Sequence, residues 1–124
     1  MAFPDWPTSG GRNLFAYPWL RSAGAQFIEH GHRLAGSAVG ILTLALAFGV
    51  WKRDTRVWTK EMALLAAAAV LLQGVLGGMR VRMDSKGLAF LHACLAQAFF
   101  ALTAMLATVL SPAWAMREES GHDP

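Results

Sequence analysis

The sequence has few charged residues: Asp, Glu, Lys and Arg make up only 15% of its 124 residues, against about 25% in an average soluble domain. Three stretches, 34–51, 62–79 and 87–116, contain none of these four residue types. A helix of about 18 residues rises about 27 Å, close to the roughly 30 Å hydrocarbon core of a bilayer. The scarcity of charge therefore favours three membrane-spanning helices over a soluble helical bundle, and predicts an all-α transmembrane fold.

Cysteine and continuous basic surfaces are also scarce. The single cysteine, Cys94, lies in an apolar stretch, so an intrachain disulfide is excluded. The net charge is +3, but the basic residues stand at the ends of the apolar stretches and in short loops, where anionic lipid headgroups attract them. Because aromatic residues do not alternate with a basic face, the sequence predicts a lipid bilayer as partner and no nucleic acid.

Three of the five prolines lie in the first 25 residues, and the sequence divides into three parts. Residues 1–25 hold Pro4, Pro7 and Pro18, which predict an irregular segment. Its Trp6, Tyr17 and Trp19 suit the level of the lipid headgroups. Residues 26–111 are expected to form the three-helix transmembrane domain, with helices at 26–51, 60–81 and 88–110. Residues 112–124 are expected to form a polar tail after Ser111 and Pro112. The positive-inside rule gives no orientation, because Lys and Arg are spread over both sides.

Two histidines inside the apolar helices are the main candidate functional residues, because ionisable groups are costly in a membrane. The first and third helices cross the membrane in the same direction, and His32 and His92 each lie within two turns of a helix start. They are therefore expected at the same depth. Two facing imidazoles are what the iron of a six-coordinate haem requires, so the pair predicts a bound haem. The alternative for each histidine is a structural, hydrogen-bonded role.

Small residues accompany the two histidines. His32, Gly36 and Gly40 form one stripe of the first helix, and three glycines cluster in the second, at Gly74, Gly77 and Gly78. These stripes suit a flat ligand such as a porphyrin, with Gly36 as a candidate contact. Small residues spaced by four are equally typical of tight packing between membrane helices, and the sequence does not separate the two interpretations.

A charged group precedes the first histidine. Glu29 is three residues before His32, so both share a helical face, and its carboxylate at the edge of the hydrocarbon is a candidate proton acceptor. Arg33 is a candidate partner of a haem propionate. Its alternative is an ion pair with Glu29, which is four residues away. His30 projects about 160° away from His32, at about 100° per residue, and is expected to be interfacial.

Four motifs together resemble the haem A synthase family. EHGHRLAG at 29–36 is similar to its Glu-x-x-His-Arg motif, and QGVLGGMRV at 73–81 resembles a glycine-rich signature. HACLAQAF at 92–99 resembles the segment with its second histidine ligand, and PDWPTS at 4–9 resembles a preceding loop. The resemblance implies oxidation of the methyl group of haem O to the formyl of haem A for assembly of the terminal oxidase. It implies His32 and His92 as axial iron ligands, with haem O as substrate or a b-type haem, and Glu29 as a catalytic group.

The resemblance also implies an incomplete fold. The family has two related four-helix halves, and this chain matches three helices of the first half. The position of a family cysteine pair is taken here by Phe3 and Ser9. A missing helix or second half is expected from another chain or from a second copy. The expected location is a bacterial plasma membrane. Two alternatives stay open: a non-enzymatic bis-histidine cytochrome that relays electrons, and a structural or assembly protein that binds no haem.

Overall fold

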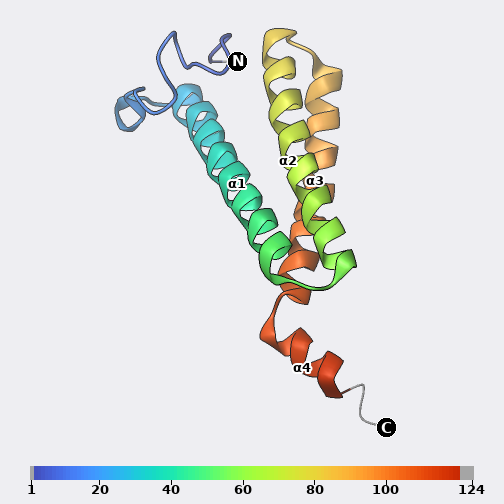
Figure 1. Cartoon of the computed structure of the whole chain (residues 1–124). Helices are drawn as coiled ribbons and strands as arrows, with labels where there is room; N and C mark the ends of the chain where they lie inside the picture. Colours follow the sequence, from blue (N-terminus) through green and yellow to red (C-terminus); the bar gives the residue numbers. More distant parts are fainter. Residues whose placement is uncertain (1, 121–124) are drawn as a thin grey trace.

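The computed structural model describes residues 2–120 and is helical along most of that length. A short 3-10 helix, η1 (Trp19–Arg21), precedes α1 (Ala25–Arg53), α2 (Val57–Arg82), α3 (Lys86–Val109) and α4 (Pro112–Ser120). Within the described residues the only extended pairing is an isolated bridge between Ser9 and Arg12. The prediction of an all-α fold is confirmed (Figure 1).

Helices α1, α2 and α3 are each long and apolar enough to cross a membrane. Leucine, isoleucine, valine and phenylalanine side chains on these helices are exposed on the outside of the bundle, where lipid rather than water is the favourable neighbour. The chain is therefore an integral membrane protein. The predicted helices at 26–51, 60–81 and 88–110 agree with the observed ones to within three residues at each end.

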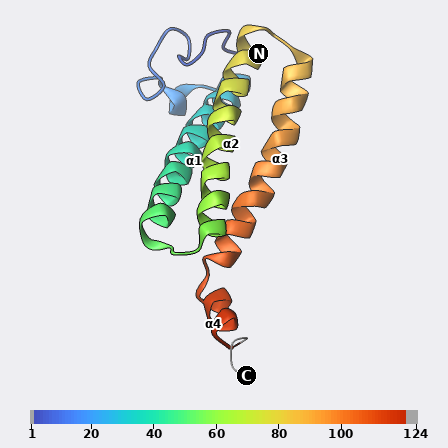
Figure 2. The same ribbon diagram turned by 45° about the vertical axis from the view of Figure 1, so that its right-hand side comes forward.

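The central helix is α2, which packs against both α1 and α3 (Figures 1 and 2). The buried cluster Val50, Ala63, Ala66 and Leu106 joins all three helices near the α1–α2 loop. From that end α1 diverges from α2 toward the other end of the bundle, where residues 2–24, here called the N-terminal segment, lie (Figure 1). The bundle is therefore closely packed at one end and more open at the other, where His32 and His92 lie.

Polar contacts close the two turns between the helices. Both Asp54 carboxylate oxygens accept from the Arg56 guanidinium, and this hydrogen bond lowers the pKa of Asp54 below its ordinary value. Arg56 also donates to the carbonyl of Val109, at 3.2 Å, which ties the loop to the end of α3. At the other turn, Ser85 caps α3 by accepting from the amide of Leu88 at 3.3 Å.

The last part of the chain differs from the polar tail expected at 112–124, because residues 112–120 form α4. Pro112 does not prevent this helix, since its ring is tolerated at the first helical position, where no intrahelical partner for an amide is needed. Ser111 precedes it, and its hydroxyl accepts from the amide of Trp114 at 3.4 Å. Helix α4 projects beyond the closely packed end of the bundle (Figure 2). The end of the expected tail, 121–124, lies outside the described residues.

The closely packed end can be tested by truncating its central side chain. Leu106 is fully buried, so Leu106→Ala is expected to lower the free energy of unfolding by about 2 kcal/mol or more. Leu65→Ala removes the same atoms from a side chain that is 60% exposed and is the matched control, with little expected change. Unfolding in detergent micelles followed by tryptophan fluorescence measures both, and equal effects of the two variants would contradict the packing described.

Candidate functional site

The two histidines predicted to face one another lie side by side at the open end of the bundle. His32 is the eighth residue of α1 and His92 the seventh of α3. Their ring centroids are 6.3 Å apart, and the ring planes are nearly perpendicular, at 88°. Helices α1 and α3 both pack on α2, so the two imidazoles approach each other from helices on either side of it.

This separation fits two imidazoles that share one metal. A metal–imidazole bond is about 2 Å long and the ring centre lies about 1 Å further on, so two rings on opposite sides of one metal have centres about 6 Å apart. Among residues 2–120 no group of three or more His, Cys, Asp or Glu side chains could hold a metal ion. A pair of imidazoles suits a metal whose other donors belong to a macrocycle, as in haem, which needs two protein ligands.

The glycines near the histidines have different roles. A Cβ at Gly77 would lie 3.4 Å from Cε1 of His92, so this glycine gives the imidazole its place against α2. A Cβ at Gly36 or Gly74 would meet no heavy atom of the described chain within 4 Å. Both residues are exposed, so neither glycine forms a close helix crossing within the described chain. A Cβ at Gly40 would lie 4.0 Å from Val70 of α2, an ordinary contact with a neighbouring helix.

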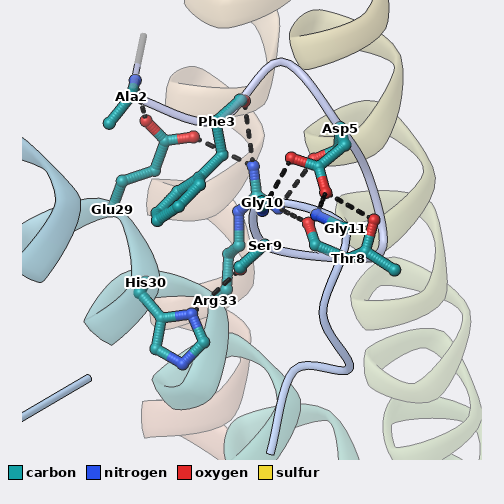
Figure 3. Close-up of polar contacts among 10 residues, drawn as sticks. All are labelled: Ala2, Phe3, Asp5, Thr8, Ser9, Gly10, Gly11, Glu29, His30 and Arg33. Carbon is teal, nitrogen blue, oxygen red and sulfur yellow. Dashed lines mark hydrogen bonds and ion pairs between the residues drawn. The ribbon is translucent and has the colours of Figure 1, made fainter. Parts of the chain in front are cut away.

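Glu29 and Arg33 form an ion pair, with 2.9 Å between Glu29 Oε1 and Arg33 Nη2. The other carboxylate oxygen accepts from the amide of Ala2 at 2.7 Å. Nη1 of Arg33 donates to the carbonyl of Asp5 at 2.8 Å and to that of Thr8, and Nη2 also donates to the carbonyl of Phe3 at 3.3 Å. The sequence left open an ion pair or a haem propionate as the partner of Arg33, and the structure shows the ion pair (Figure 3).

His30 is buried, which differs from the interfacial position expected for it. It is only 1% exposed, and its Nδ1 lies 2.9 Å from the hydroxyl of Ser9. The ring also packs against Tyr17, with 4.7 Å between centroids. The angle between His30 and His32 correctly placed them on different faces, but nothing in the sequence showed that the N-terminal segment would cover the face of His30. With Glu29 and Arg33, this histidine attaches that segment to α1.

A tight turn gives the N-terminal segment its own structure. The Asp5 carboxylate accepts from the hydroxyl of Thr8 and from the amides of Gly10 and Gly11, the last two at 3.1 and 2.9 Å. Both glycines have positive φ, 59° and 73°, a backbone conformation that favours glycine. The Thr8 hydrogen bond, helped by that of Gly11, lowers the pKa of Asp5 to about 2. Asp5 therefore stays ionised at neutral pH and maintains the turn, whose carbonyls Arg33 contacts.

Trp6 extends from this turn to α2. A Cβ at Gly78 would lie 2.7 Å from the Trp6 indole, so the indole rests directly on the backbone of α2, although 43% of Trp6 is exposed. Trp19 instead stacks on Phe27 and donates its Nε1 to the carbonyl of Phe27 at 2.9 Å. The N-terminal segment therefore contacts α1 through Arg33 and α2 through Trp6.

Comparison with known sequences identifies the family of the chain. Residues 19–123 match the sequence model of the COX15-CtaA family, described as cytochrome oxidase assembly protein. The chain is 30% identical over 106 residues to a heme A synthase of Halalkalibacterium halodurans, covering 85% of this chain and 33% of that protein. It is 32% identical over 109 residues to a heme A synthase of Bacillus pumilus, covering 86% and 34%. It spans about a third of the length of these relatives. No solved structure matches it.

The contact of Trp6 with α2 can be tested at Gly78. In Gly78→Ala the new methyl group would occupy the place of the indole, so we expect Trp6 to leave α2 and trypsin to cleave after the exposed Arg12 several-fold faster. Gly74→Ala adds the same methyl group to the same helix, where nothing lies within 4 Å, and is expected to leave cleavage unchanged. Mass spectrometry of the N-terminal fragment over time measures both rates. Identical rates in the two variants would show that Trp6 does not rest on Gly78.

Proposed function

Because the chain belongs to the COX15-CtaA family of cytochrome oxidase assembly proteins, we propose that it holds haem between His32 and His92 and acts in the oxidation of haem O to haem A. The observation that carries the proposal is the 6.3 Å separation of the two rings, which fits a metal with two axial imidazoles. Its relatives in Halalkalibacterium halodurans and Bacillus pumilus are heme A synthases, which supports the same reaction.

In this proposal each helix supplies one part of the site. His32 on α1 and His92 on α3 would hold the haem iron, and Gly36 and Gly74, where a Cβ would meet no atom within 4 Å, would leave room for the porphyrin. When bound, the haem supplies one-electron redox chemistry at its iron. With both imidazoles bound, the iron would offer no place to dioxygen, so the oxygen of the formyl group would come from water and the four electrons removed from the methyl group would pass to an acceptor outside this chain. Whether the haem held here is haem O itself or a b-type haem is decided by the haem extracted from the purified protein.

Glu29 is the proposed proton acceptor of this site. It lies one helical turn before His32, and its Oε1 is held by Arg33. Its Oε2 accepts from the amide of Ala2, so release of that amide frees one carboxylate oxygen to take up a proton. Arg33 then has a positioning role, because it keeps the Glu29 side chain in one orientation. Its remaining hydrogen bonds hold the N-terminal segment over the start of α1 (Figure 3).

The ion pair of Glu29 also favours a second candidate function. A carboxylate that is already bound by Arg33 and Ala2 can be purely structural, and the histidine pair alone would suit an electron-relaying cytochrome. The two functions differ in what they require of Glu29, since an electron carrier needs no proton acceptor at this position.

The surroundings proposed for the site are a bacterial plasma membrane and a further helix. The relatives named above are bacterial, and the chain has three helices that could span a membrane. None of the residues in the most apolar 18-residue stretch of α3 is fully buried in this chain. A helix of another chain, or of a second copy, could cover this face and close the haem site on that side.

The haem proposal predicts the optical spectrum of the chain purified in detergent from a haem-producing host. We expect a Soret band and the bands of a low-spin, six-coordinate haem. His32→Ala and His92→Ala are each expected to abolish the six-coordinate spectrum, because one axial ligand is lost. Cys94→Ala, at an exposed position two residues from His92 on α3, is the control and should keep the spectrum. Absence of any band in the unmodified protein, or an unchanged band in His92→Ala, would disprove this ligand pair.

Glu29→Gln separates the two candidate functions. If Glu29 accepts a proton in the oxidation, the substitution is expected to reduce conversion of haem O to haem A by about 100-fold or more, while the haem spectrum is retained. Chromatography of haems extracted after incubation with haem O measures the conversion. Glu61→Gln, at an exposed glutamate in the first turns of α2, is the matched control. Equal conversion by both variants, or none by the unmodified chain alongside reversible haem reduction, would favour the electron relay.

A further inference from the structure

A glutamine in the middle of the apolar helix α2 contacts the backbone at one of the two histidines. Gln73 is 91% buried, since only 9% of its surface is exposed, and its side chain faces α3. Its Nε2 donates to the carbonyl oxygen of His92 at 3.2 Å. Because a carbonyl oxygen can only accept a hydrogen bond, the nitrogen of the Gln73 carboxamide must face the His92 carbonyl, and the carboxamide oxygen points away from that carbonyl. A buried amide in a membrane-spanning helix is costly unless it is hydrogen-bonded, so its presence at this position calls for a reason.

Oε1 of Gln73 and Nδ1 of His92 are buried at this contact, and neither meets the geometric criteria for a hydrogen bond among the described residues. The imidazole of His92 also lies beside the backbone of Gln73. Oε1 is an acceptor. Nδ1 carries a proton when the neutral imidazole uses Nε2 to bind a metal. The two atoms are complementary, they belong to residues already in contact, and each is in an environment where an unmade hydrogen bond is unfavourable.

The His92 ring is oriented with its Cε1–Nδ1 edge toward the side of α2 that carries Gln73. Cε1 and Nδ1 of His92 lie 3.4 and 3.9 Å from the position of a Cβ on Gly77, whereas Nε2 is not within 4 Å of it. Gly77 follows Gln73 by four residues, so both lie on the same face of α2. The Nδ1 edge of the imidazole therefore faces the side of α2 that carries Gln73, which leaves Nε2 as the nitrogen available to a metal.

We propose that Gln73 is the positioning residue of His92: its Nε2 fixes the α3 backbone at the carbonyl of His92, and its Oε1 accepts the Nδ1 proton when Nε2 binds the haem iron. When the ring nitrogen that does not bind the metal donates a hydrogen bond to a nearby acceptor, that bond fixes the tautomer and orientation of the histidine and raises its basicity. His32 has no such partner in the described part of the chain, so the two ligands are held by different means. The inference rests on the proposed function, because it gives His92 the role of an iron ligand.

The test compares three single variants of the full chain loaded with haem. Gln73→Leu removes both hydrogen bonds and keeps the size of the side chain. Gln73→Glu keeps an acceptor for Nδ1 and removes the donor to the carbonyl. Gln97→Leu, at an exposed glutamine on α3, makes the same change away from the site. The measurements are the rate of haem transfer to apomyoglobin, the equilibrium reduction potential of the haem, and helix content by circular dichroism.

We expect Gln73→Leu to weaken haem binding by about 10–100-fold and to raise the reduction potential, because a less basic imidazole stabilises the oxidised iron less. Gln73→Glu should shift the potential in the opposite direction, and Gln97→Leu should change neither quantity.

A purely structural Gln73 would shift the potential in the same direction in both Gln73 variants or leave it unchanged, and either result overturns the inference. If Gln73→Leu loses its helix content, the direction of the shift in Gln73→Glu decides. Absence of haem from the unmodified chain would refute the proposed function and this inference together, whereas a haem spectrum with unshifted Gln73 variants refutes this inference alone.

Discussion

The open end of the bundle depends on the contacts of the Arg33 guanidinium with three backbone carbonyls, those of Phe3, Asp5 and Thr8. A guanidinium has five donors in a fixed planar arrangement, so one side chain of α1 can fix the path of residues 3–8, which are irregular apart from their turn. The segment so held extends to α2, where Trp6 rests on Gly78. It therefore connects the two helices at the end where they diverge (Figure 1).

The charged motif at the start of α1 is divided between two helical faces. Glu29, His30 and Arg33 all bind the N-terminal segment, whereas His32 projects toward His92. Three residues of this motif therefore fix the N-terminal segment, and one is directed into the bundle. Direct participation of Glu29 in chemistry remains compatible with this division, because one of its oxygens is held only by the amide of Ala2.

The sequence predicted the three helices and the meeting of His32 with His92, because both follow from local rules. Charge-free stretches fix the spans, and the count of residues from each helix start fixes depth. The contacts of Arg33 and the burial of His30 could not be predicted, since backbone carbonyls give no sequence signal of which side chain they will accept from. The hydrogen bond of Gln73 to the carbonyl of His92 was not predicted for the same reason. Helix α4 was missed because Pro112 was interpreted as a stop, when a proline equally suits a first helical position.

The two histidines are therefore held by forces of different kinds. His92 lies between Gly77 and the buried Gln73, inside the α2–α3 contact, where hydrogen bonds are shielded from water and gain strength. His32 is exposed on α1, and the neighbouring Glu29, His30 and Arg33 bind the N-terminal segment. A flat ligand between the two histidines would therefore meet one imidazole held inside the α2–α3 contact and one exposed on α1 beside a segment attached by polar contacts.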